Sequence, residues 1–449
     1  MTGESGDSDQ ARENPVTIRR EVLDPGSGAH FVVAASNDSR VRVHGGIPGE
    51  RVQVRLETDD PSWARIVGWD HVSSDRRDPP CPYASACGGC HWLSIDEKRQ
   101  QAIRRERLFA LCAAHGIDLS TAAITEIPSR DAIAYRYRAR LQIDGTVRPA
   151  RIGFHGDRDW TIVDATACAM FAPPLARAYE SVRRLILSDE TDAIADLTGA
   201  EIVALEGSVG ALVYLNPRDR APAAWPQLGE QWLTRGGAAL AGVAVRVPRG
   251  DARPAVLGCP AIVGRAPRGM PVAAAARGFV QANLGCAERL ARAIADRIVG
   301  LLPSPRVMEL FAGSGLFGWA VADVGADVRG VEWDEAAVAA AQLLPPPRLG
   351  RFRCESGDSR RAALNDCDLL LTDAPRAGLG RLAHSIVEHG PSWVVLISCY
   401  AETLVRDLTV LVSGGYELKE LWLADFYPQT QHLESVVFLQ RSISGASAR

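Results

Sequence analysis

The spacing of apolar positions divides the chain into three parts. From Val16 to Ile66, short runs such as HFVVAA, RVRVHG and RVQVRLE have the composition and period of β-strands, and Gly and Pro stand at the breaks. We therefore expect a small β-barrel over residues 15–72. Residues 1–14 are polar and aperiodic, which predicts a disordered leader.

Residues 73–278 have a less regular pattern, which indicates a central α+β domain. Residues 96–114 have the spacing of a helix, and strand-like and helical stretches then mix. In the segment YRYRAR, residues 135–140, aromatic and cationic residues interleave at strand period. One strand face would present three arginines to RNA phosphates, although a solvated strand with a buried aromatic face explains the same pattern.

The last part, residues 279–449, alternates apolar runs with helical patterns. This alternation is typical of an α/β fold with a Rossmann-like parallel sheet. The strands that we expect are RVMELF, VRGVEW, RFRCES, CDLLLT, SWVVLIS and LESVVFLQ.

Composition limits the class of protein more than its function. The chain has 449 residues, of which 47% are hydrophobic and 23% charged, as in multidomain globular proteins. It has no apolar window long enough for a membrane span and no signal peptide, so we expect a cytoplasmic protein without a membrane partner. The net charge of -4 gives no sign of nucleic-acid binding by itself.

A glycine-containing turn in the last part indicates a nucleotide site. The run VMELFAGSGLFG is an apolar strand followed by Gly313-x-Gly315 at the start of a helix, and Glu332 ends the next strand. Glycines let the backbone approach a ligand, and an acid at that strand end can accept both ribose hydroxyls. The third glycine of the dinucleotide motif is absent, which favours S-adenosylmethionine over NAD. Asp358, after the third strand, would suit the adenine, although a plain strand-to-helix turn remains an alternative.

Three further residues stand where strands of this sheet begin or end. Asp373 and Cys399 follow strands, and Glu434 begins the final strand. In an open parallel sheet the ligand crevice lies at the carboxyl ends of the strands, so these residues should face the same crevice as Gly313. Methylation of uracil C5 needs a thiolate that adds to C6 and a base that removes the C5 proton. Cys399 and Glu434 match those needs, although each residue taken singly has an ordinary structural explanation.

The cysteines suggest a metal or cluster site. Three of the ten cysteines, Cys81, Cys87 and Cys90, crowd one loop, and Cys168 is the candidate for a fourth ligand. Four thiolates can hold zinc or a [4Fe-4S] cluster, and free cysteines are the third possibility.

Several motifs resemble the uracil-5 RNA methyltransferase family (RumA/TrmA type). The runs LTDAPRAG, ISCYAETLVRDL and DFYPQTQHLESVVFL, with VMELFAGSG and FVQAN, match that family in order over residues 279–441. The resemblance implies a class I methyltransferase domain in which Cys399 is the nucleophile and Glu434 the base. It also implies that Gln281, Phe311, Glu332 and Asp373 contact S-adenosylmethionine.

The spacing of the cysteines is similar to that of the ribosomal RNA branch of the family, whose cysteines bind a [4Fe-4S] cluster. The turn GIPGE, residues 46–50, resembles the TRAM domain, an OB-like barrel that binds RNA. The chain departs from the family at Leu316, where an Asn is usual, and in the LLPPPRLG segment. These departures put cofactor affinity in doubt.

The sequence therefore predicts a methyltransferase with S-adenosylmethionine and a [4Fe-4S] cluster as cofactors, acting as a monomer. The expected partner is RNA, with 23S ribosomal RNA preferred to tRNA. A tRNA enzyme, a catalytically silent RNA-binding protein and a redox-regulated protein are the alternatives.

Overall fold

The computed structural model describes residues 17–34, 39–188, 192–218, 225–246, 255–276 and 278–442, so the predicted leader lies outside the described residues. Packing divides the chain into two units. The first contains residues up to Asp78 together with His91–Asp96, and the second contains Pro79–Cys90 and all residues from Glu97 onward.

The first unit contains a closed barrel, as the strand pattern predicted. Its strands in barrel order are β1 (Thr17–Leu23), β2 (Phe31–Ala34), β3 (Arg40–Val43), β5 (Trp63–His71) and β4 (Arg51–Leu56). The GIPGE turn is fixed by the fully buried Glu50, whose carboxylate accepts a hydrogen bond from the backbone N–H of Ile47 and pairs with Arg76 at 2.6 Å. A buried charge needs such partners, so Glu50 locks the turn.

The central part of the second unit is built on a seven-stranded sheet. Its strands in sheet order are β13 (Ala255–Gly258), β12 (Leu240–Val245), β11 (Ala211–Pro217), β10 (Leu197–Val203), β7 (Arg138–Asp144), β8 (Arg151–His155) and β9 (Ile162–Asp164). The helices α2 (Pro173–Leu187) and α4 (Trp225–Gly236) pack on it around Leu175, Val182 and Trp232. Shorter elements are α3 (Asp192–Ala195), η1 (Gly237–Ala239) and the hairpin β14 (Ala261–Arg265) and β15 (Pro271–Ala275).

The C-terminal part is a sheet of eight strands. In sheet order they are β18 (Arg351–Ser356), β17 (Asp327–Glu332), β16 (Arg306–Leu310), β19 (Leu369–Ala374), β20 (Trp393–Ser398), β22 (Glu434–Arg441), β21 (Tyr416–Ala424) and β6 (Ala123–Ile127). The strands from β18 to β20 run parallel, whereas β22 pairs antiparallel with both neighbours. The α/β class and the six strands expected from the sequence are confirmed.

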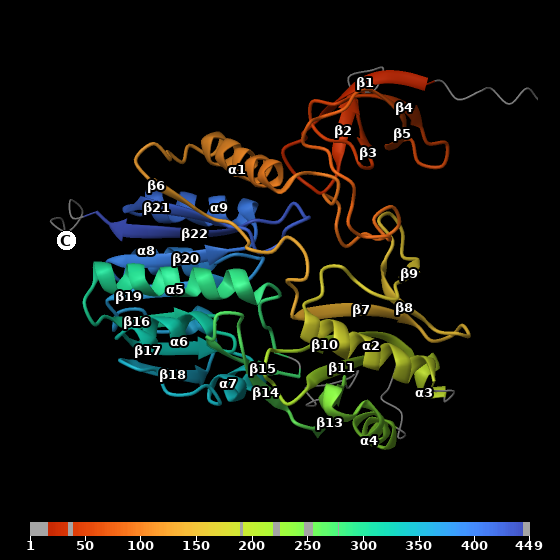
Figure 1. The fold of residues 1–449 in the computed structure, drawn as a ribbon. Coiled ribbons are helices and arrows are strands. Elements are labelled where there is room, and N and C mark those ends of the chain that lie inside the picture. The colour runs from red at the N-terminus through yellow and green to blue at the C-terminus, as the bar shows by residue number, and fades with distance from the viewer. Residues whose placement is uncertain are drawn as a thin grey trace, which may run out of the picture. The chain divides into compact units, whose positions relative to one another are not determined.

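Helices cover both faces of this sheet (Figure 1). Side chains alternate along each strand, so Leu369 and Leu371 of β19 join one core and Leu370 joins the other. The first core includes α5 (Leu284–Leu301) and α6 (Leu316–Asp323). The second includes α1 (Glu97–Ala114), α8 (Arg381–His389) and α9 (Ala401–Ser413). The remaining elements are α7 (Glu335–Ala341) and η2 (Ser359–Arg361).

The structure differs from the expected division at residue 279. Both α1 and β6 precede that residue, yet β6 pairs with β21 in the C-terminal sheet and α1 packs on its second face. Residues 97–127 therefore belong structurally with the C-terminal part. Within the described residues, no helix is long and apolar enough to cross a membrane.

Candidate active site

A pocket of about 580 Å³ opens at the carboxyl ends of β16, β19 and β20, where the sequence predicted a crevice. Of the nine predicted catalytic and cofactor residues, seven line it. They are Gln281, Phe311, Gly313, Glu332, Asp373, Cys399 and Glu434. The pocket also contains Arg138, one of the three arginines expected to contact RNA phosphates. The other lining residues had no predicted role and are Phe279, Trp333, Asp334, Ala337, Ala374, Pro375, Arg376, Tyr427 and His432.

One half of the pocket is formed by the glycine turn and the end of β17. The carboxylate of Glu332 accepts hydrogen bonds from the backbone N–H groups of Gly313 and Asp334, each at 2.9 Å. Phe311 and Gly313 both have positive φ, at 58° and 55°, so the chain turns sharply as it leaves β16. This geometry exposes backbone and an acidic side chain to the same space.

Gly315 and Asp358 do not line the pocket. Gly315 caps α6 with φ +83°, and a Cβ there would lie 2.5 Å from the ring of Phe352. Asp358 caps η2, where its side chain accepts a hydrogen bond from the backbone N–H of Arg360 at 3.0 Å. Gly315 thus contributes to the shape of the turn without lining the pocket, and the Asp358 side chain caps the N-terminus of η2.

The buried Glu309 lies behind the glycine turn. Its Oε1 accepts a hydrogen bond from the backbone N–H of Gly318 at 3.0 Å, and burial raises the pKa of Glu309 to about 8. Since the carboxyl is buried beneath the turn, it contributes to the turn's shape and does not line the pocket.

The other half of the pocket contains Cys399, Glu434 and Asp373. Ser398 of β20 is paired with Ser435 of β22, so Cys399 and Glu434 are the next residues along the two antiparallel strands. Asp373 is near the end of the neighbouring parallel strand β19 and accepts a hydrogen bond from the Gln281 amide at 3.2 Å. The sheet register therefore brings a thiol and two carboxyls together.

Burial and like charge set the protonation of these groups. Burial raises the pKa of Asp373 to about 7. Burial and the nearby Asp373 charge raise the pKa of Glu434 well above its usual value. The pKa of Cys399 rises to about 11 because of burial and the two carboxylates, while Arg376 opposes that rise. The free pocket thus favours neutral forms, and the guanidinium of Arg376 is the group that favours the thiolate.

The four predicted cluster cysteines are neighbours in the second unit. Cys87 and Cys90 are on the loop before α1, where Cys87 forms a β-bridge with Gly156, and Cys168 precedes α2. Burial and then charge on the other cysteines, opposed by Arg136, raise the pKa of Cys90 to about 12 and of Cys168 to about 11. The charge of Cys81 contributes to both shifts, so all four thiols lie within electrostatic reach of one another.

The segment YRYRAR, residues 135–140, does not present three arginines on one exposed strand face, which was the first of its two interpretations. The half-buried Arg136 lies over the Tyr135 ring and interacts electrostatically with Cys90, while Arg138 and Arg140 both pair with Glu201, at 2.6 and 2.9 Å. Tyr135 and Tyr137 are buried, as the alternative interpretation expected. Only Arg138 of the segment lines the pocket.

Several pocket residues could have been found from the sequence. Phe279 is in the FVQAN run, Arg376 in LTDAPRAG, and Tyr427 and His432 in DFYPQTQH, all runs that resemble family motifs. Trp333 carried no signal beyond its place next to Glu332. Strand ends indicate where a pocket is, but loop side chains depend on how each loop folds.

The family model described as tRNA (Uracil-5-)-methyltransferase matches residues 361–442. A 23S rRNA (uracil(1939)-C(5))-methyltransferase of Halomonas elongata is 28% identical over 96% of this chain and 92% of its own length. The protein of that name from Pectobacterium atrosepticum is 29% identical over 94% of this chain and 92% of its own length.

Among solved structures, the tRNA (uracil-54, C5)-methyltransferase of Pyrococcus abyssi, in complex with S-adenosyl-L-homocysteine, matches with a TM-score of 0.70. At 21% identity it covers 94% of this chain and 99% of its own, which supports the fold. The relatives match over nearly the whole chain and the family model covers the segment with Asp373, Cys399 and Glu434. Over nearly its whole length the chain is similar to uracil-5 RNA methyltransferases.

Proposed function

We propose that this protein transfers a methyl group from S-adenosylmethionine to C5 of a uridine in 23S ribosomal RNA. The observation that carries the proposal is that Cys399, directly after β20, and Glu434, at the start of the paired strand β22, line one pocket with Asp373 and the glycine turn. The ribosomal substrate is the one in the names of the bacterial relatives. Such an enzyme would work in the cytoplasm.

The residues of the turn half fit S-adenosylmethionine. Each oxygen of Glu332 accepts one backbone hydrogen bond and keeps a lone pair for a ribose hydroxyl. Trp333, 69% exposed, offers an aromatic face at the pocket for the adenine. The buried Oε1 of Gln281 has no hydrogen-bond partner within the described structure and suits the ammonium of the cofactor. When bound, the cofactor supplies an electrophilic methyl group.

The residues of the other half supply the chemistry at the uracil. The Cys399 thiolate adds to C6, which forms a C6–S bond and makes C5 nucleophilic, and C5 then takes the methyl group. The Glu434 carboxylate removes the C5 proton, and the C6–S bond breaks as the C5–C6 double bond returns. Thiolate formation requires loss of the Cys399 proton, which the adjacent Arg376 cation favours. The proposed role of Asp373, hydrogen-bonded to Gln281, is to contact both cofactor and base.

We further propose that Cys81, Cys87, Cys90 and Cys168 bind a [4Fe-4S] cluster. Four partly buried thiols within electrostatic reach of one another are a suitable donor set for such a cluster. The proposed role is structural, because this methyl transfer needs no electron transfer. For the barrel we propose RNA binding of TRAM type, supported by the Arg76 guanidinium lying over the half-exposed Trp69 ring.

The experiment that tests the proposed function is nucleoside mass spectrometry of ribosomal RNA and tRNA, incubated separately with the full-length protein and S-adenosylmethionine without oxygen. We expect 5-methyluridine in ribosomal RNA with the wild type and none with Cys399→Ala. Cys367→Ala, which changes a thiol outside the pocket, is the matched control and should keep full activity.

The other outcomes assign the alternatives. If 5-methyluridine forms in tRNA and not in ribosomal RNA, the substrate is wrong and the reaction stands. If neither RNA is methylated and S-adenosylmethionine gives no thermal shift, the protein is a silent RNA-binding relative, and the proposed function fails.

A further inference from the structure

The connection between β21 and β22 carries part of the pocket. This segment, Asp425–Leu433, is called the β21–β22 loop, and it contributes Tyr427 and His432 to the pocket immediately before Glu434. At its base Ala424 pairs with Glu434, so the two ends of the loop are fixed by the sheet. The middle of the loop lies outside the sheet, so other contacts must fix its position.

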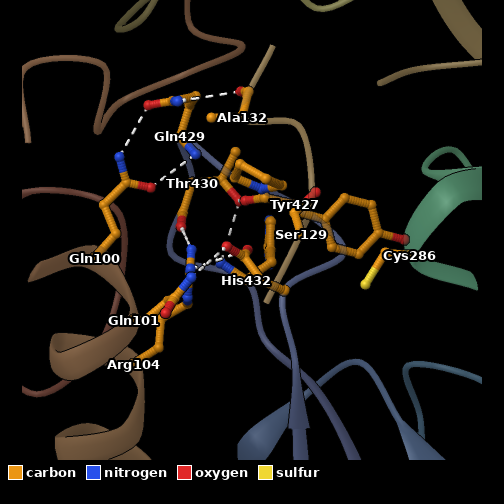
Figure 2. Close-up of polar contacts among 12 residues, drawn as sticks. Gln100, Gln101, Arg104, Ser129, Ala132, Cys286, Tyr427, Gln429, Thr430 and His432 are labelled. Atoms are coloured by element: carbon orange, nitrogen blue, oxygen red, sulfur yellow. Dashed lines mark hydrogen bonds and ion pairs between the residues drawn. The ribbon is translucent and has the colours of Figure 1, made fainter. Parts of the chain in front are cut away.

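The side chain of Gln100 in α1 holds that middle (Figure 2). Its oxygen accepts a hydrogen bond from the backbone N–H of Gln429 at 2.8 Å, and its amide nitrogen donates to the side-chain oxygen of Gln429 at 2.9 Å. Both glutamines are fully buried. Two hydrogen bonds between buried amides define the distance and the orientation of the loop relative to the helix.

A second α1 side chain, Arg104, holds the loop one turn further along. It donates to the backbone carbonyl of Thr430 at 2.8 Å and forms a 2.9 Å ion pair with Asp425 at the start of the loop. The Thr430 hydroxyl donates to the carbonyl of Tyr427 at 2.8 Å and accepts from the backbone N–H of His432 at 3.3 Å. The helix is thus linked through Thr430 to the two pocket residues of the loop.

The loop backbone itself needs this support. Gln429 has φ +71°, a left-handed conformation that is costly for a residue with a side chain. The conformation persists because Gln100 takes the N–H of Gln429 and the carbonyl of Ala132 takes its side-chain amide, at 3.1 Å. These contacts, together with the hydrogen bond from the Tyr135 hydroxyl to the Pro428 carbonyl at 3.1 Å, stabilise the loop next to Tyr427.

We propose that Gln100 and Arg104 are positioning residues for the methylation reaction: from α1 they fix the β21–β22 loop so that Tyr427 and His432 close the substrate side of the pocket. The cofactor side, formed by Phe311, Gly313 and Glu332, comes from other elements. The inference rests on the proposed function, and it requires that substrate handling be sensitive to α1 while cofactor affinity is not.

The test compares Gln100→Leu and Gln100→Glu with Arg105→Gln in the full-length protein. Arg105 is on the same helix but pairs with Glu126, outside the loop, so it is the matched control. We expect Gln100→Leu to lower kcat/KM for RNA by about 10- to 100-fold, since small misplacements near reacting groups have effects of this size. The Kd for S-adenosylmethionine, measured by calorimetry, should stay within about two-fold of the wild type, because the misplaced loop does not form the cofactor side of the pocket.

Gln100→Glu keeps the acceptor for the Gln429 N–H and should restore part of the lost activity. Thr430→Val, which removes the hydroxyl linking Tyr427 and His432 without changing α1, should give the same split and serves if Gln100→Leu folds poorly. Wild-type kcat/KM in both Gln100→Leu and Thr430→Val, or equal losses of cofactor affinity and activity, would overturn the inference. A wild type that methylates no RNA would instead overturn the proposed function.

Discussion

Asp373 and Glu434 place two buried carboxyls in one pocket, and the charge of Asp373 affects the protonation of Glu434. Glu434 can act as a base only when it has lost its proton, and burial with the Asp373 charge raises its pKa. The same two carboxylates raise the pKa of Cys399. Both the proposed nucleophile, Cys399, and the proposed base, Glu434, therefore become deprotonated more readily as the pH rises, and activity should increase with pH.

Removing the charge of Asp373 should shift this pH dependence. In Asp373→Asn the pKa values of Glu434 and Cys399 should both fall, so the rising limb of the kcat profile should move to lower pH, although its height should drop. Single-turnover rates across pH give the measurement. Asp366→Asn removes an exposed carboxyl outside the pocket and is the control. An unchanged midpoint in Asp373→Asn would show that its charge does not tune the pair.

At the scale of elements, the turn between β16 and α6 depends on Gly315. Its φ of +83° and the 2.5 Å that would separate an added Cβ from the Phe352 ring leave no room for a side chain. Gly300, in α5, has open space around it and a helical environment. Substitution by alanine should therefore change the stability of the protein in opposite directions at the two glycines.

Gly315→Ala should lower the free energy of unfolding by about 1–3 kcal/mol or more, because it combines backbone strain with a clash. It should also weaken S-adenosylmethionine binding by displacing the turn. Gly300→Ala should instead raise stability by about 0.5–1 kcal/mol through helix propensity. Urea denaturation and calorimetry of both variants measure these effects, and equal stability in the two would contradict the assigned role of the turn.

Strong apolar runs predicted most strands of the C-terminal sheet. Runs such as WVVLIS are buried on both faces, whereas the edge strand RFRCES, β18, was predicted although it is mostly exposed. Two other strands were missed. The edge strand AITEI, β6, is largely exposed, and YELKELWLA, β21, carries charges within an apolar pattern, so neither was predicted. Strand ends and chemistry pointed to Cys399 and Glu434, which line the same pocket, whereas the Gln100–Gln429 contact joins distant segments and leaves no local sequence pattern.

At the scale of the whole molecule, the proposed cluster would join two distant segments of the second unit. Cys81, Cys87 and Cys90 come before α1, and Cys168 comes before α2. A group bound by all four would cross-link the loop to the central sheet, where Cys87 already bridges Gly156. Loss of one ligand should therefore affect both iron content and stability.

Cys168→Ser should abolish the visible absorption and most of the iron of protein purified without oxygen, and it should lower Tm. Cys259→Ser changes a cysteine away from the four and should keep both signals. Iron analysis, absorption spectra and thermal unfolding measure the difference. Full iron content in Cys168→Ser would remove this residue from the proposed ligand set.

Two separate segments of the chain build the C-terminal sheet and its covering helices. The strand β6 and the helix α1 belong to this part, although they come long before its other strands in the sequence. A fragment cut at residue 279 would lack its edge strand and the helix over Leu421 and Leu439, leaving an unpaired β-edge and bare apolar surface. It would also lack Gln100, which is hydrogen-bonded to Gln429 of the β21–β22 loop. The C-terminal sheet is therefore not encoded by residues 279–449 alone. A chimeric protein that takes this part from the chain must also include residues 97–127.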